Sequence, residues 1–131
     1  MLLNHFESLL LKSSFRRLLH RYVDFGIWKK LSSKVALSGK ALEVGCGRGF
    51  GLEILARQPY EFDSLIGVDP DSSMVSLAKK TVAAWPRIKI VEGRLSDVIN
   101  EDDVHDFVLC SQVLHHIHNW QTAIQEISFR T

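Results

Sequence analysis

The chain has 131 residues, of which 46% are hydrophobic and 24% charged, and its formal net charge is +1. This length fits one compact domain and excludes two separate ones. The near-neutral charge argues against a dedicated nucleic-acid binder, because such proteins carry a clustered basic excess. No apolar run approaches the roughly 18 to 20 residues that span a bilayer. We therefore expect no nucleic-acid or membrane partner.

The start of the chain and its two cysteines indicate the cellular compartment in which we expect the protein. Residues 1–7 lack the basic segment and the small-residue cleavage site of a signal peptide. The two cysteines, Cys46 and Cys110, form no Cys-x-x-Cys pair, which is typical of a reduced compartment without a disulfide framework. A cytoplasmic location is the prediction.

The first 38 residues are predicted to form a helical cap. Residues 2–23 carry apolar side chains at the spacing of one helical face, with basic side chains on the other. Two interpretations are open: a helix on a membrane surface, or a helix that packs on a core with its polar face in solvent. The acidic and hydroxyl residues among the basic ones favour the packed helix. A second helix is predicted over 25–37 and is ended by Ser38 and Gly39.

After Gly39 short apolar runs alternate with helical patterns. Strands are predicted over 41–44, 64–68, 88–91 and 106–110, and helices over 50–58, 72–85 and 119–128. Asp71 or Ser72 is a good N-cap for the second of these helices. Strands that alternate with helices predict an α/β fold with a parallel sheet.

The stretch Glu43-Val44-Gly45-Cys46-Gly47-Arg48-Gly49 lies where a predicted strand turns into a helix. Glycine lets the backbone turn sharply there and lets a ligand approach closely. A dinucleotide fingerprint needs glycines at its first, third and sixth positions, and no frame of this stretch has them. A phosphate loop also fails, because no Gly-Lys-Ser/Thr follows. A nucleotide-dependent oxidoreductase is therefore disfavoured.

This stretch, an acid followed by one spacer and then Gly-x-Gly-x-Gly, resembles motif I of the class I S-adenosylmethionine (SAM)-dependent methyltransferases. Three further segments, 67–71, 91–93 and 106–117, resemble the later motifs of the small-molecule branch (methyltransferase type 11-like). The resemblance covers about residues 39–128. It implies a Rossmann-like, mostly parallel sheet in the order 3-2-1-4, SAM as the cofactor, and in-line methyl transfer to a small-molecule acceptor.

The same resemblance implies which residues bind the cofactor. Asp69 is the acid expected on the ribose hydroxyls, because an ionised carboxylate accepts two hydrogen bonds, although an N-cap is the alternative for it. Glu43 is expected near the amino acid part of SAM, or else is a plain strand-end carboxylate. Met74 is expected either beside the adenine or in the core. The full predicted set is Glu43, Gly45, Cys46, Gly47, Gly49, Asp69, Pro70, Met74, Gly93, Arg94 and Cys110.

Two positions depart from the family. Gly93-Arg94-Leu95 stands where the family has Gly-Asp-Ala, so the acid that contacts the adenine amino group is missing, and Arg94 accepts no hydrogen bond. Asp97 or a backbone carbonyl replaces that acid, or the affinity for the cofactor is lower. Arg48, where the family has a small residue, either holds a carboxylate or points to solvent.

Three histidines, His115, His116 and His118, follow the fourth predicted strand. No cysteine or acid stands beside them at ligand spacing, so we predict no metal site. In the family this segment lies beside the reacting methyl group, which makes His116 or His115 the candidate base or acceptor contact. Helix packing and capping is the alternative role.

The family chain normally continues well beyond the helix that follows strand four, so we expect a truncated domain, the SAM-binding half, over residues 39–131. The fourth strand then becomes a sheet edge with unpaired backbone groups, which predicts a homo-oligomer joined at that edge. The alternative function is a catalytically inactive Rossmann-like module for oligomerisation or interaction that has lost the cofactor.

Overall fold

The computed structural model describes residues 37–57, 60–98, 103–111 and 113–128, together with Val23, Gly26 and Lys30. The chain divides into two units, Met1–Ala36 and Leu37–Thr131. The two predicted N-terminal helices fall almost entirely outside the described residues. In the described part, none of the helices has the length and apolar character needed to cross a bilayer.

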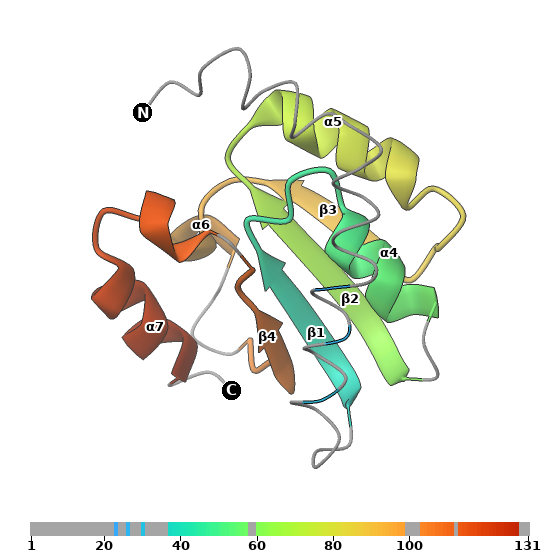
Figure 1. Ribbon diagram of the computed structural model, residues 1–131, viewed down its shortest axis with the longest axis horizontal. Helices are drawn as coiled ribbons and strands as arrows, with labels where there is room; N and C mark the ends of the chain where they lie inside the picture. The colour runs from blue at the N-terminus through green and yellow to red at the C-terminus, as the bar shows by residue number, and fades with distance from the viewer. Residues whose placement is uncertain are drawn as a thin grey trace. The chain divides into compact units, whose positions relative to one another are not determined.

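The second unit is built on a four-stranded sheet whose order is β3-β2-β1-β4 (Figure 1). Its strands are β1 (Ser38–Val44), β2 (Glu61–Asp69), β3 (Ile88–Glu92) and β4 (Phe107–Leu109). Every neighbouring pair is parallel. The predicted α/β class, the Rossmann-like sheet and its 3-2-1-4 order are confirmed.

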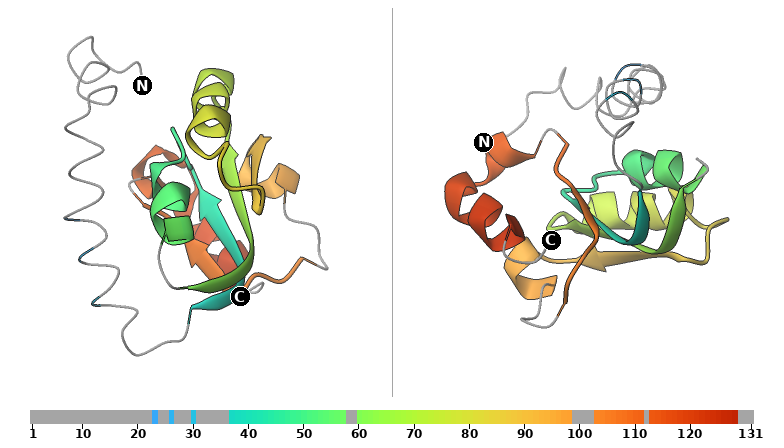
Figure 2. Two further views of the ribbon diagram at one scale, coloured as in Figure 1. Left: turned by 90° about the vertical axis from the view of Figure 1, so that its right-hand side faces the viewer. Right: turned by 90° about the horizontal axis from the view of Figure 1, so that it is seen from below.

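Helices cover both faces of this sheet. Helices α4 (Phe50–Arg57) and α5 (Ser72–Thr81) lie on one side, and α6 (Leu95–Val98) and α7 (Trp120–Ser128) on the other (Figures 1 and 2). A short 3-10 helix, η2 (Leu114–His116), stands between β4 and α7. The crossovers from β1 to β2 and from β2 to β3 move along the sheet in the same direction. Because parallel crossovers are right-handed, both of their helices, α4 and α5, lie on the same face. The long return from β3 to β4 runs over the opposite face.

The central strand β1 shows how the two layers share the core. Leu42 and Val44 point to the α6–α7 side, where they form a buried cluster with Val68, Leu95 and Ala123. The Glu43 side chain between them points the other way, toward α4. Because both faces of β1 are covered, its last four residues are all buried.

The ends of two predicted elements are wrong. Ser38 and Gly39 do not end a helix but begin β1, where Ser38 pairs with Glu61 and Gly39 takes a φ of 80°. Helix α5 ends at Thr81 rather than at residue 85, because the chain closes into a tight turn in which Trp85 N–H donates to Val82 O (2.8 Å). The proline that follows Trp85 disfavours helical backbone at that residue.

Candidate functional site

The glycine-rich loop connects β1 to α4 at the carboxyl end of the sheet. The N–H groups of Gly45 and Cys46 both donate to the carbonyl of Val68 in β2, at 2.8 and 3.0 Å, and Gly49 N–H donates to Cys46 O at 2.8 Å. Gly45, Gly47 and Gly49 have φ values of 69°, 52° and 78°. These left-handed angles are the reason that the loop needs glycine.

Close contacts with other parts of the chain also require glycine at two of these three positions. A Cβ on Gly45 would overlap the Val113 side chain, and one on Gly49 would lie 3.2 Å from the Cβ of Ala78 in α5. Gly47 differs, because a Cβ there would meet no atom within 4 Å. The middle of the loop therefore faces open space, which leaves room for a ligand to approach the backbone.

Asp69 at the end of β2 is tied to this loop. Its Oδ2 accepts from Gly47 N–H at 2.8 Å, and its Oδ1 accepts from Asp71 N–H at 2.9 Å. The N-cap of α5 is Asp71, whose carboxylate accepts from Ser73 N–H and Met74 N–H, which confirms the capping prediction. Asp69 is thus not the cap, and its side chain serves the loop.

Glu43 lies beneath the loop, on the side of β1 that faces α4. Its Oε2 accepts from Leu52 N–H at 3.1 Å, and a Cβ on Gly51 would overlap its carboxyl group. Burial raises the pKa of Glu43 from 4.5 to about 8; the Leu52 hydrogen bond opposes this rise and the charge of Asp69 adds to it. The side chain is therefore largely protonated at neutral pH, and it holds the first turn of α4.

Both cysteines sit at strand ends beside Glu43. Cys46 is buried and Cys110 half-buried, and both are free thiols. Burial raises the pKa of each thiol, and the Glu43 carboxyl adds to the effect. A raised pKa suppresses the thiolate that nucleophilic chemistry needs, so packing is the role that their surroundings favour.

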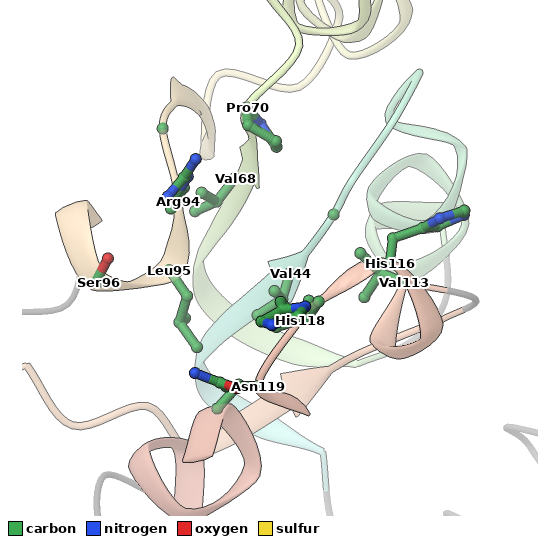
Figure 3. A pocket seen from close by; sticks show the side chains of 14 residues that line it. Val44, Val68, Pro70, Arg94, Leu95, Ser96, Val113, His116, His118 and Asn119 are labelled. Atoms are coloured by element: carbon green, nitrogen blue, oxygen red, sulfur yellow. The ribbon is translucent and has the colours of Figure 1, made fainter. Parts of the chain in front are cut away.

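A cavity of about 560 Å³ opens beside the loop, on the α6–α7 side of the sheet (Figure 3). Five of the predicted site residues line it: Gly45, Pro70, Gly93, Arg94 and His116. The rest of its lining was not predicted from the sequence: Val44, Val68, Leu95, Ser96, Val113, Ile117, His118, Asn119 and Ala123.

The remaining predicted residues do not line this cavity. Met74 is half-buried on α5, and the His115 side chain lies outside the described residues. The others belong to the loop and to the strand ends behind it: Glu43, Cys46, Gly47, Gly49, Asp69 and Cys110. The structure thus separates a loop cluster from a pocket cluster, and Gly45 belongs to both.

His118 and Asn119 are, with Ser96, the polar pocket residues that were not predicted from the sequence. Figure 3 shows the His118 side chain near the centre of the lining, while the His116 ring projects to its margin. The position of His118 and Asn119 next to the histidine motif was the available signal. Within the described ranges, no three His, Cys, Asp or Glu side chains gather as a metal site would require.

The two positions that depart from the family have local partners. Asp97 accepts from the backbone N–H of Arg94 at 2.8 Å and so caps the short helix α6; it does not line the cavity. The Arg48 guanidinium lies 5.2 Å from the centre of the Phe50 ring, which is a cation–π distance. Neither arrangement restores an acid to the pocket.

A parallel α/β sheet, a glycine loop after β1 and an acid at the end of β2 define a Rossmann-like fold. Comparison with known proteins identifies the family within this class. Residues 42–128 match the methyltransferase domain family. The chain therefore belongs to that family, and its homologues are SAM-dependent methyltransferases.

Individual relatives are more distant. A demethylmenaquinone methyltransferase of Staphylococcus aureus is 26% identical over 105 residues, which are 78% of this chain and 44% of that protein. The chain thus spans about half the length of the curated relatives that it matches.

Among solved structures, a SAM-dependent methyltransferase from Aquifex aeolicus has a TM-score of 0.72 at 19% identity, covering 93% of this chain and 63% of its own. The plantazolicin methyltransferase BpumL in complex with SAH has a TM-score of 0.67 at 19% identity, covering 92% and 46%. At these identities the two structures establish the fold alone.

Proposed function

We propose that this chain binds SAM at the carboxyl ends of β1 and β2 and transfers its methyl group to a small-molecule acceptor in the adjoining cavity. The observation that carries the proposal is the loop around Gly47, which faces open space while Asp69 holds its N–H. Membership of the methyltransferase family supports the chemistry. The SAH complex of a relative of the same fold supports the cofactor.

The residues present fit this cofactor. Asp69 uses one acceptor site on each oxygen, for Gly47 N–H of the loop and for Asp71 N–H before α5. An ionised carboxylate has about four such sites, so acceptors remain for the two ribose hydroxyls. Gly47 leaves the backbone open to close approach. The cavity volume of about 560 Å³ lies within the range of small-molecule sites, roughly 300 to 1,000 Å³. When bound, SAM supplies a methyl group on a positively charged sulfur.

Under this proposal the predicted cofactor residues have two roles: some contact the cofactor, and the others shape the loop and the strand ends. Those that line the cavity contact the cofactor directly: Gly45, Pro70, Gly93 and the Arg94 backbone. Gly47 and Asp69 contact it from the loop. The residues behind them shape the loop and the strand ends: Glu43, Cys46, Gly49, Met74 and Cys110.

The acceptor side of the cavity supplies positioning and a proton acceptor. Its walls are apolar, with Val44, Val113 and Ile117 among them, so they exclude water from the reacting groups. His116 lines the cavity, and an unprotonated imidazole nitrogen can serve as a general base. We keep His116 as the candidate base or acceptor contact, with His115 as the alternative.

Calorimetric titration with SAH tests the cofactor site. Wild-type protein is expected to bind SAH with micromolar affinity, and Asp69→Ala and Gly47→Ala to weaken this binding at least tenfold, the worth of about 1.4 kcal/mol. Asp63→Ala is the matched control, because Asp63 is an exposed carboxylate on the same strand. Circular dichroism checks that each variant is folded. Equal affinities for the Asp69 and Asp63 variants would refute the assignment.

The second candidate is a catalytically inactive module, and Arg94 favours it, because an arginine stands where the family has its adenine-contacting acid. No binding of SAH at millimolar concentration by folded protein would support this alternative. Under the first proposal the SAM-binding half, predicted over residues 39–131, begins with β1 at Ser38, the residues before it are a helical cap, and the protein is cytoplasmic.

A further inference from the structure

The edge strand β4 is held on the sheet by a short ladder and by a clamp at its amino end. The strand has 3 residues, and each of them pairs with β1. Just before them, Asp106 N–H donates to Lys40 O at 2.8 Å, and Lys40 N–H donates to the Asp106 carboxylate at 2.7 Å. Gly39 leaves room for this carboxylate, since a Cβ there would overlap it. The two Asp106 bonds are therefore a large part of what fastens so short a strand.

The segment that leads into this clamp reverses the usual order of burial. Val104 is 58% exposed, whereas His105, the next residue, is 5% exposed. Valine is among the residues most often found inside proteins, and histidine is less often fully buried. Hydrophobic burial therefore does not explain which of the two side chains points inward. The chain before β4 is anchored by a titratable side chain, and the apolar one beside it is left in solvent.

Three charged side chains act on the His105 imidazole within the described ranges. They come from Lys40 on β1, from Asp106 at the clamp and from Asp103 in the segment before β4. Burial has the largest effect and lowers the pKa of His105 from its ordinary value of 6.5. The charge of Lys40 adds to this lowering, while both aspartates and a hydrogen bond to the Asp103 backbone oppose it. The buried imidazole is thus neutral at pH 7.

A proton on His105 makes its burial unfavourable. Because the pKa is lower in the buried state, a segment released into solvent takes up the proton more readily than the folded one. The free energy that holds the segment is complete above about pH 6.5, and it falls as the pH drops from there toward the lower folded pKa. Asp106 is the next residue along the chain, so a displaced His105 pulls directly on the clamp.

We propose that His105 is an acid-sensitive latch for β4: in its neutral form it holds the chain so that Asp106 clamps the strand to β1, and its protonation releases the clamp. The release reaches the glycine loop, because Val113, which follows β4, is the side chain that a Cβ on Gly45 would overlap. The latch itself does not rest on the proposed function, since its residues lie at the amino ends of β1 and β4.

Amide hydrogen exchange on the full chain, followed by NMR, tests the latch. The reporter is the Asp106 amide, which donates to Lys40 O, and the reference is the Leu65 amide of β2, which donates to Arg87 O. We expect the Asp106 amide to be less protected than Leu65, and its protection factor to fall roughly three- to tenfold from pH 7.5 to 5.5. About tenfold is the upper limit, because a released imidazole titrates near pH 6.5.

His105→Gln removes the titration and keeps a polar side chain, so the acid-dependent fall is expected to disappear. His118→Gln is the matched control, because it removes an exposed histidine, and it is expected to keep the fall. A fall that persists in His105→Gln, or that is absent from wild type or from His118→Gln, would overturn the proposal. Equal protection of the Asp106 and Leu65 amides would do so too, since β4 would then open only with the whole fold.

Titration of the His105 imidazole in the wild-type protein by NMR keeps the test valid if His105→Gln does not fold. The latch requires a midpoint below pH 6.5 together with the acid-dependent fall at the Asp106 amide, and a midpoint at or above pH 6.5 would overturn it. These measurements use no cofactor, so their failure leaves the proposed function standing, and a failure to bind SAH leaves the latch standing.

Discussion

Replacing Glu43 by glutamine tests the buried acid beneath the loop. Glutamine keeps an oxygen for Leu52 N–H and a similar shape, but it does not titrate. In the wild-type protein the pKa of Glu43 is about 8 when folded, against 4.5 as the ordinary value. The folded state therefore retains a proton that the unfolded chain releases, so the free energy of unfolding falls as pH rises from about 4.5 to about 8.

The pKa difference sets the size of the effect. Each pH unit in this window is worth about 1.4 kcal/mol, so wild type loses up to about 3 kcal/mol between pH 4.5 and 7 through this group. Glu43→Gln removes that loss. The variant is expected to match wild type near pH 4.5 and to become more stable than wild type as pH approaches 8.

Urea unfolding of both proteins across this pH range measures the difference, because contributions from the other groups cancel in it. Glu92→Gln serves as the control, since Glu92 is exposed at the end of β3. A wild-type-minus-variant difference that stays flat, or that grows in favour of wild type with rising pH, would show that the acid is not held in its protonated form.

Two further predictions concern the loop and the sheet edge. Gly49→Ala should lower the free energy of unfolding by about 2 kcal/mol, because it combines a left-handed φ with a Cβ contact to Ala78. Gly47→Ala should lower it less, since a Cβ there meets no atom within 4 Å. Equal losses of stability in thermal or urea unfolding would contradict the packing explanation. The homo-oligomer predicted at the β4 edge is expected to give a multiple of the chain mass in light scattering, and a monomer at every concentration would contradict it.

Local chemistry made much of the fold predictable from the sequence. The alternation of strands and helices follows from hydrophobic period, and the Asp71 cap follows from residue type beside a helical pattern. The strand order came from the resemblance in the motifs rather than from residue spacing. The sheet has this order, β3-β2-β1-β4, and all of its neighbouring strands are parallel.

Contacts between distant parts of the chain were not predictable. Gly45 faces Val113, 68 residues away in the chain, and no local pattern announces that approach. The helices α6 and η2 span 4 and 3 residues, which is too short for a helical period to show. His118 also lines the pocket unpredicted. It lies in the turn between η2 and α7, and no sequence pattern shows where a side chain in such a turn points.

The hydrogen bonds of Asp69 explain how one carboxylate can serve both the loop and a ligand. Gly47 N–H and Asp71 N–H each take one oxygen, so the loop and the start of α5 are fixed before any ligand arrives. Because the two N–H donors leave acceptor sites on both oxygens, a diol adds hydrogen bonds without displacing the loop. An arrangement formed in advance loses less conformational entropy on binding, so the structural bonds of Asp69 are compatible with the binding role that we propose for it.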